Sequence, residues 1–110
     1  MVSIEPADKG TAADGSVRLV YRDGSRECGQ VVVRTEGPKA QLLQAAGENT
    51  LILDALVRAA LNAADLAGAR EMVCQVPTLY PTLSAVGFVK SDKGMGIQIR
   101  EFFNHPCSHP

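Results

Sequence analysis

The stretch TLILDALVRAALNAADLAGA, residues 50–69, carries most of the information on the fold. After Thr50 its polar residues recur at intervals of four, four and three positions. They are Asp54, Arg58, Asn62 and Asp65. This spacing predicts a helix with one narrow polar stripe, because residues three and four apart share a helix face. The remaining circumference is rich in Ala and Leu, so we expect the helix to be buried against a sheet and a further element.

Both ends of this helix carry boundary signals. Asn49 or Thr50 can cap its start, because a short polar side chain accepts a hydrogen bond from an otherwise free backbone N–H group. Gly68 is expected to end it. Asp54 and Arg58 are four residues apart, so we expect them to form an ion pair.

The residues after this helix alternate between short segments of two kinds. REMVCQV, residues 70–76, predicts a short central strand, and TLYPTLSAV, residues 78–86, predicts a short helix. GFVKS, residues 87–91, starts another strand. MGIQIREFF, residues 95–103, alternates apolar and polar residues and predicts a returning strand.

The residues before the helix predict three strands. SVRLVYRDG, residues 16–24, alternates apolar and polar side chains and ends on an Asp-Gly turn pair. CGQVVVRT, residues 28–35, is rich in β-branched residues and predicts the return strand of a hairpin with a loop of about three to five residues. A third strand is expected within residues 37–49, after a Gly-Pro turn, and breaks at Gly47.

The element order is therefore strand, strand, strand, helix, strand, helix, strand, strand. It predicts an α/β (α+β) fold, in which helices pack on a mixed, mostly antiparallel sheet with one β-α-β crossover. We expect a single domain over residues 16–103, a flexible N-terminal segment over 1–15 and a tail over 104–110.

The composition narrows the class of protein. The 110 residues are 45% hydrophobic and 21% charged, as in globular domains. The formal charge of −1 offers no basic stripe for nucleic acid, and no apolar run approaches the ~20 residues of a membrane span. Cys28, Cys74 and Cys107 form no CxxC pair, and the N-terminal residues lack the apolar core of a signal peptide. We therefore expect free thiols and a cytoplasmic location.

Two segments resemble the GCN5-related N-acetyltransferases, the GNAT superfamily. They are DALVRAALNAADLAGAREMVC, residues 54–74, and VPTLYPTLSAVGFV, residues 76–89. In that family a long helix leads into a core strand, and a short helix closed by Gly-Phe follows. The resemblance covers roughly residues 16–103 and implies transfer of an acetyl group from acetyl-CoA to an amine.

The family binds the pyrophosphate of acetyl-CoA at a glycine-containing turn before the long helix, where backbone N–H groups and the helix dipole favour anions. The resemblance implies cofactor binding by Gln44, Gly47, Asn49 and Thr50. Leu51 and Leu53 occupy glycine positions in one alignment, and Glu48 adds a carboxylate that would repel phosphate. An N-cap that holds no ligand is the alternative role of this turn.

The family also has an Asn after the core strand and a Tyr four positions before Gly-Phe, which acts as general acid toward the departing thiolate. Val76 and Leu83 stand at these positions. Tyr80, one helical turn earlier, is the remaining candidate for a catalytic hydroxyl, with packing as its alternative role.

The thiols and histidines point to no further chemistry. Cys74 lies mid-strand among apolar neighbours, which predicts a buried, inert thiol. His105, Cys107 and His109 alternate in the tail, but their spacing is not that of a structural zinc site, so no metal is predicted.

Two functions follow for this chain. The first is an acetyl-CoA-dependent N-acyltransferase acting on an unknown amine. The alternative is a non-catalytic GNAT-like scaffold that serves as a binding or interaction module. In both cases we expect an uncovered apolar face and hence a homodimer, with a small-molecule acyl donor as possible ligand and with no nucleic-acid or membrane partner.

Overall fold

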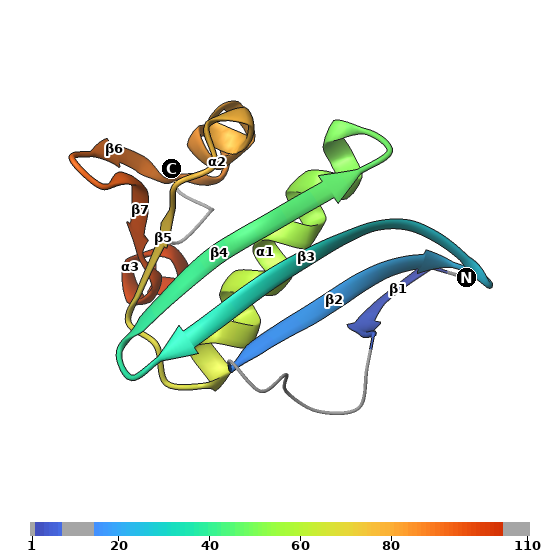
Figure 1. The fold of residues 1–110 in the computed structure, drawn as a ribbon, viewed down its shortest axis with the longest axis horizontal. Helices are drawn as coiled ribbons and strands as arrows, with labels where there is room; N and C mark the ends of the chain where they lie inside the picture. Colours follow the sequence, from blue (N-terminus) through green and yellow to red (C-terminus); the bar gives the residue numbers. More distant parts are fainter. Residues whose placement is uncertain (1, 8–14, 105–110) are drawn as a thin grey trace.

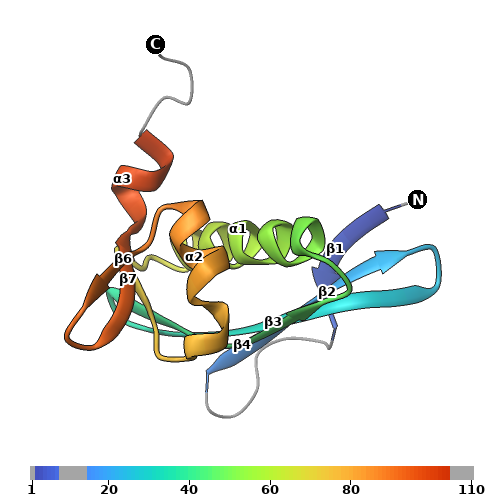
Figure 2. The ribbon, with the colours of Figure 1, turned by 90° about the horizontal axis from the view of Figure 1, so that it is seen from above.

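A computed structural model describes residues 2–7 and 15–104 of the chain. These residues form a seven-stranded sheet in the order β1-β2-β3-β4-β5-β7-β6, with helices on one face (Figures 1 and 2). The strands are β1 Val2–Pro6, β2 Ser16–Asp23, β3 Arg26–Glu36, β4 Lys39–Gly47, β5 Glu71–Cys74, β6 Val89–Ser91 and β7 Gly94–Gln98. The helices are α1 Thr50–Leu66, the 3-10 turn η1 Pro77–Leu79, α2 Tyr80–Val86 and α3 Ile99–Asn104.

Strand β5 pairs in parallel with β4 through the α1 crossover, and the other strand pairs are antiparallel. The predicted mixed, mostly antiparallel sheet with one β-α-β crossover is therefore confirmed. Strand β5 lies between β4 and β7, which confirms that it is an interior strand.

Two tight turns join β2, β3 and β4. Each turn has two central residues. The first of them is Gly24 in the β2–β3 turn, with φ 65°, and Gly37 in the β3–β4 turn, with φ 61°. A positive φ at that position alone is the signature of a type II′ turn, whose twist matches that of the flanking strands. The first hairpin is confirmed, with a shorter loop than predicted, because β3 begins at Arg26 and not at Cys28.

Both ends of α1 are capped. The Oδ1 atom of Asn49 accepts a hydrogen bond of 2.9 Å from the backbone N–H of Ile52, so Asn49 is the N-cap. Gly68 adopts φ 96°, and the N–H groups of Gly68 and Ala69 donate to carbonyls of the last turn at 3.0 and 2.9 Å. This is a Schellman ending, so the predicted stop at Gly68 is confirmed.

Helix α1 packs on β2, β3 and β4 with its apolar circumference. Its buried residues are Leu56, Val57, Ala60, Leu61 and Ala64. They meet the sheet side chains Leu19, Val31, Val33, Ala40 and Leu42. The polar stripe faces away, and Nε of Arg58 donates to Oδ1 of Asp54 at 2.6 Å, as predicted. Burying each such Leu or Val stabilises the fold by about 1.5–3 kcal/mol.

No helix among the described residues covers the opposite face of the sheet (Figure 2). We call it the outer face. Its polar residues include Arg18, Arg22, Gln30, Arg34 and Gln41, which alternate along the strands with side chains that face α1. Val20 and Val32, the register partners of Gln30 and Arg18, lie on the same face. The outer face therefore combines polar and apolar residues and is not uniformly apolar, as we had expected of an uncovered face.

The N-terminal residues contain a strand that the sequence did not predict. Strand β1 pairs antiparallel with β2 at one edge of the sheet, where we expected a flexible segment over residues 1–15. Ile4 packs against the core, and Oε1 of Glu5 lies 3.5 Å from Nε of Arg22. Residues 8–14 lie outside the described part of the chain.

The predicted strand over residues 95–103 is wrong in its second half, where β7 gives way to α3. Strand β5 supplies the reason, because its first residue, Glu71, already pairs with Gln98. Beyond that pair β7 has no partner on the β5 side. Ile99 is fully buried instead, and its N–H donates to the carbonyl of Arg70 at 2.9 Å. The tail with His105, Cys107 and His109 lies outside the described residues.

Candidate functional site

Strands β4 and β5 stay paired over only four residue pairs, from Lys39 with Glu71 to Leu42 with Cys74. Beyond Leu42, β4 runs on to Gly47, whereas the chain after Cys74 turns into η1. The two segments diverge from this point (Figure 1). We call the region between residues 43–47 and residues 75–77 the β4–β5 splay.

A β-bulge in β4 marks the start of this splay. Val33 pairs with Leu42, but its neighbour Val32 pairs with Gln44, so that Leu43 is the extra residue. A bulge bends its strand and increases the local twist. The bulge therefore directs β4 away from β5 immediately after their last shared pair.

The β4–α1 turn lies at the open end of the splay. Gly47 ends β4, Asn49 caps α1 and Thr50 is the first helical residue, so the structure brings these three predicted residues together. Among the described residues, the backbone N–H groups of Thr50 and Leu51 have no acceptor. Two amide donors thus lie at the positive end of the helix dipole, an arrangement that suits an anion.

Gln44 stands apart from this turn. It lies three residues before Gly47 on β4, opposite Val32, and its side chain is exposed. Three residues of strand span about 10 Å. The structure therefore separates Gln44 from Asn49 and Thr50, although all were predicted to bind the cofactor.

Gly47 has a packing role in this turn. A Cβ atom at this position would lie 3.0 Å from the backbone nitrogen of Leu53 and 3.1 Å from Cγ2 of Ile52. Only glycine lets the end of β4 approach the first turn of α1 so closely. Leu51, which one alignment places at a family glycine position, is 81% exposed.

Glu48 is held by a residue that the sequence analysis missed. Nη2 of Arg26 lies 2.7 and 2.8 Å from the two carboxylate oxygens of Glu48. Arg26 starts β3, and the pairing of Gly29 with Gly47 brings the two side chains together across 22 residues of sequence. The guanidinium offsets part of the repulsion that we expected between Glu48 and a phosphate.

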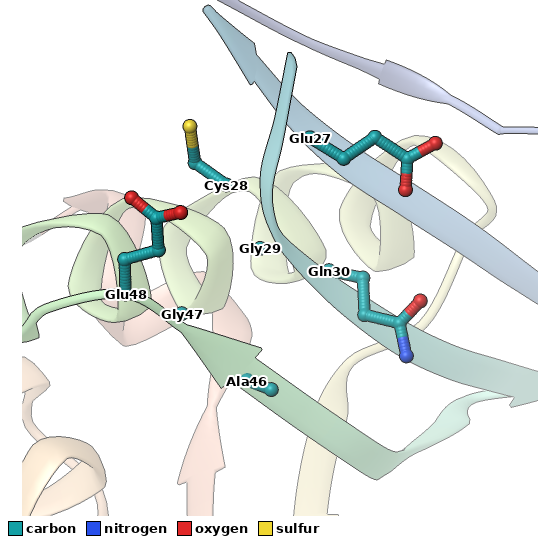
Figure 3. Close-up of a pocket in the computed structure, with 7 residues that line it drawn as sticks. All are labelled: Glu27, Cys28, Gly29, Gln30, Ala46, Gly47 and Glu48. Carbon is teal, nitrogen blue, oxygen red and sulfur yellow. The ribbon is translucent and has the colours of Figure 1, made fainter.

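A shallow hollow of about 350 Å³ lies beside this ion pair, at the ends of β3 and β4. Cys28 and Glu48 lie on one side of it, and the side chains of Glu27 and Gln30 point the other way (Figure 3). Its centre lacks side chains because Gly29 is paired with a second glycine. A Cβ atom at Gly29 would lie 2.9 Å from Cδ1 of Leu56, so close packing also requires this glycine.

The hydroxyl of Tyr80 lies near β7. A Cβ atom built at Gly94 would be 3.1 Å from that hydroxyl oxygen and would clash with the carbonyl oxygen of Cys74. The hydroxyl therefore lies near the end of β5, close to Gly94 of β7 and the carbonyl of Cys74. Leu83, at the family's tyrosine position, is fully buried in the core, and Val76 is half-buried.

Cys74 is fully buried at the closed end of the splay, as predicted. Burial raises the pKa of its thiol, and a hydrogen bond with the backbone of Val76 lowers it by a smaller amount. The thiol is therefore neutral near pH 7 and is a poor nucleophile.

The described residues contain no group of three or more His, Cys, Asp or Glu side chains that could hold a metal ion. Within residues 2–7 and 15–104, no helix has the length and apolar character needed to cross a membrane.

Solved acetyltransferase structures share this architecture. The ribosomal-protein-S18-alanine N-acetyltransferase from Escherichia coli aligns over 90% of this chain and 94% of its own, with a TM-score of 0.73 and 10% identity. The chain has the GNAT fold. In this chain the splay runs along β4 toward the β4–α1 turn at the end of that strand.

Two further structures with the GNAT fold contain a cofactor. The GNAT family acetyltransferase from Elizabethkingia anophelis, with acetyl-CoA bound, aligns over 83% of this chain and 78% of its own, at a TM-score of 0.69 and 13% identity. The PaiA N-acetyltransferase from Thermoplasma acidophilum, in complex with coenzyme A, aligns over 76% of this chain and 61% of its own. The TM-score is 0.65 and the identity is 18%. No protein-family model and no curated protein sequence matches the chain.

Proposed function

We propose that this protein binds acetyl-CoA along the β4–β5 splay and transfers the acetyl group to an amine. The observation that carries the proposal is the divergence of β4 and β5 after Leu42 and Cys74, toward the free N–H groups at the start of α1. Two structures of the same fold hold coenzyme A or acetyl-CoA, which supports this choice of ligand.

The residues of the β4–α1 turn fit an anionic ligand. The N–H groups of Thr50 and Leu51 would hold phosphate oxygens, and Arg26 contributes a positive charge next to Glu48. Past the last pair with β5, residues 43–46 of β4 have no strand partner on that side and can bind an extended chain through their backbone groups. Acetyl-CoA supplies an activated acyl group as a thioester.

Positioning of the two reactants is the main catalytic contribution that this chain can make. Leu83 and Val76 are hydrocarbon side chains at the positions where the family has polar groups, and neither can transfer a proton. Holding two reactants in a productive geometry contributes up to about 7–11 kcal/mol to lowering a barrier. Aminolysis of a thioester can proceed on such positioning alone when the amine arrives neutral.

The second candidate is a GNAT-like scaffold without catalytic activity, which serves as a binding or interaction module. Two observations favour it. Leu51 projects into solvent at the first turn of α1, where the family has a glycine, and Leu83 fills the core at the tyrosine position. The two functions differ in turnover, and both are compatible with cofactor binding.

A thermal-shift titration with acetyl-CoA tests the binding step. At ~100 times its dissociation constant a ligand stabilises the fold by ~2.7 kcal/mol, which raises Tm by roughly 10 °C in a domain of this size. Position 50 is the best place for a blocking charge, since an added Cβ at Gly47 would crowd α1. Thr50→Glu should keep the helix, because an acidic residue suits a helix N-terminus, and should abolish the shift.

Thr50→Gln is the matched control, since it has the same length and no charge, and it should retain the shift. Release of free thiol in the presence of an amine then separates the two functions. Binding with turnover supports the transferase, and binding without turnover supports the scaffold. If millimolar acetyl-CoA leaves Tm unchanged in the wild type, the transferase proposal fails.

The homodimer, the cytoplasmic location and the absence of a nucleic-acid partner stay predictions. Exposed apolar side chains are scattered over several elements. They are Val2, Leu51, Leu66, Val89 and Phe103. Sedimentation at several protein concentrations measures the oligomeric state directly.

A further inference from the structure

The outer face of the sheet carries three arginines in two different electrostatic situations. Arg22 lies 3.5 Å from Glu5 and 3.3 Å from Glu27. Arg18 lies 3.4 Å from the same Glu27 and also donates to the side chain of Gln30. The charges of Arg18 and Arg22 are thus largely compensated by two carboxylates.

Among residues 2–7 and 15–104, Arg34 has no such carboxylate. Its side chain is half-buried, and within the described residues Nη2 donates only to the amide oxygen of Gln41, at 3.1 Å. Two carboxylates lie further along the same face, those of Glu36 and Glu71, and Lys39 is the register partner of both. Neither forms an ion pair with Arg34. A half-buried guanidinium with a neutral partner keeps several N–H donors available for an anion.

Arg34 lies close to the closed end of the splay. It pairs in register with Gln41, and Gln41 is adjacent to Leu42, the last residue of β4 that pairs with β5. Adjacent strands are about 4.8 Å apart and residues advance about 3.3 Å along a strand, so Arg34 lies within roughly 10 Å of that point. Helices α1 and α2 cover the inner side of the sheet (Figure 2). An acceptor would therefore approach from the outer face.

We propose that the acceptor is a primary amine that also carries a carboxylate, and that Arg34 binds this carboxylate with Gln41 at its side. The proposal rests on the proposed function, because it assigns the substrate class of the same site. An amine and a carboxylate separated by roughly 5–10 Å are compatible with this backbone distance. A free ω-amino acid and the N-terminal residue of an acidic peptide both satisfy this chemistry.

The reaction balances without a further reactant. The nitrogen of the neutral amine bonds to the acyl carbon, and the bond between that carbon and sulfur breaks. One proton of the amine passes to the sulfur. The products are an amide and the free thiol of coenzyme A, and the carboxylate stays unchanged on Arg34.

Two matched pairs of acceptors test the proposal at saturating acetyl-CoA. They are 5-aminopentanoate with 5-aminopentanamide, and the C-terminally amidated dipeptides Glu-Ala with Gln-Ala. We expect kcat/KM for the carboxylate of at least one pair to exceed that of its amide by about ten-fold or more, as for a lost charge-assisted hydrogen bond. Arg34→Gln should remove this preference. Arg22→Gln, whose arginine is already paired with Glu5 and Glu27, should retain it.

A binding measurement keeps this proposal separate from the proposed function. The Nε–Hε NMR signal of Arg34 should shift on titration with 5-aminopentanoate and not with 5-aminopentanamide. If acetyl-CoA fails to bind while this shift is seen, the transferase proposal falls and the carboxylate site stands. Equal rates for acid and amide in both pairs, or a preference that survives in Arg34→Gln, would overturn the assignment of Arg34.

Discussion

Leu42 and Cys74 form the last residue pair between β4 and β5, and the two strands diverge directly after it. The backbone groups of residues 43–46 that face away from β3 thus lack a strand partner. Amide exchange reports this condition directly, because unprotected amides exchange without a local opening step. We expect these amides to exchange faster than those bonded to β3, and acetyl-CoA to slow them by about ten-fold or more. Amides of β2 serve as the control and should not respond.

The pair formed by Arg26 and Glu48 should tune affinity for acetyl-CoA more than stability. Their side chains are 60% and 46% exposed, so breaking the pair changes stability by no more than about 1 kcal/mol. Arg26→Gln leaves Glu48 unpaired beside the phosphates and should weaken binding by roughly three- to ten-fold, and Glu48→Gln should strengthen it, by Coulomb's law. Calorimetry at two salt concentrations measures both effects. An unchanged Kd in both variants would place the phosphates elsewhere.

Tyr80 and Leu83 test whether a hydroxyl on α2 takes part in catalysis. Leu83 and not Tyr80 stands at the family's tyrosine position, so we expect Tyr80→Phe to retain kcat within about three-fold, whereas loss of a general acid typically costs 10²–10⁴-fold. A loss of kcat within that larger range, with the melting temperature unchanged, would make Tyr80 the acid. Leu83→Tyr should destabilise the fold by about 1–3 kcal/mol through overpacking, without raising kcat.

Asn49 should contribute to stability independently of any ligand. Its side chain accepts the hydrogen bond from Ile52, and Asn49→Ala should lower the free energy of unfolding by about 1 kcal/mol, within a range of about 0.5–2. Urea denaturation at pH 7 measures this change, with m unaltered. Thr50→Ala is the comparison, and it should have a smaller effect because Thr50 does not cap the helix. Equal losses in the two variants would contradict the cap assignment.

Cys74 should make the fold less stable in alkali. Burial raises the pKa of its thiol above the ordinary value of 9.0, so between those two pKa values the folded state retains a proton that the unfolded state has lost. The stabilisation is complete below pH 9 and is lost as pH rises through the folded pKa, with a slope of at most about 1.4 kcal/mol per pH unit. Urea denaturation under reducing conditions from pH 7 to 10 should show a shallower decline for Cys74→Ala than for the wild type.

Most of the fold could be predicted because its signals are local. About twenty consecutive residues contain the polar stripe of α1, its cap at Asn49 and its stop at Gly68. Strand β1 and helix α3 could not be predicted in this way. Strand β1 forms because β2 has an open edge with which it can pair. Helix α3 follows Gln98 because β5 is too short to pair with β7 beyond that residue.

The candidate site was harder to predict, because its residues are brought together by pairing between strands that are distant in sequence. Gly47, Asn49 and Thr50 are neighbours in sequence and lie together, but Gln44 falls on the strand and away from the turn. Arg26 reaches Glu48 only through the register of β3 with β4. The position of Arg34 has meaning only once the helices of the described residues are known to pack on the opposite face of the sheet. Long-range pairing, which no single segment encodes, decides these relationships.

The two-residue turns at Gly24 and Gly37 also bear on how the chain reaches its native state. Strands β2, β3 and β4 are joined with almost no intervening loop, so their contacts close at small entropic cost and can form within microseconds. Strand β5 can pair with β4 only after α1 has formed the crossover between them. We therefore expect the splay to lie at the boundary between a β2–β3–β4 meander that folds early and a C-terminal half that docks later. We expect mutations in the β2–β3–β4 meander to slow folding and mutations in β5 or α2 to speed unfolding.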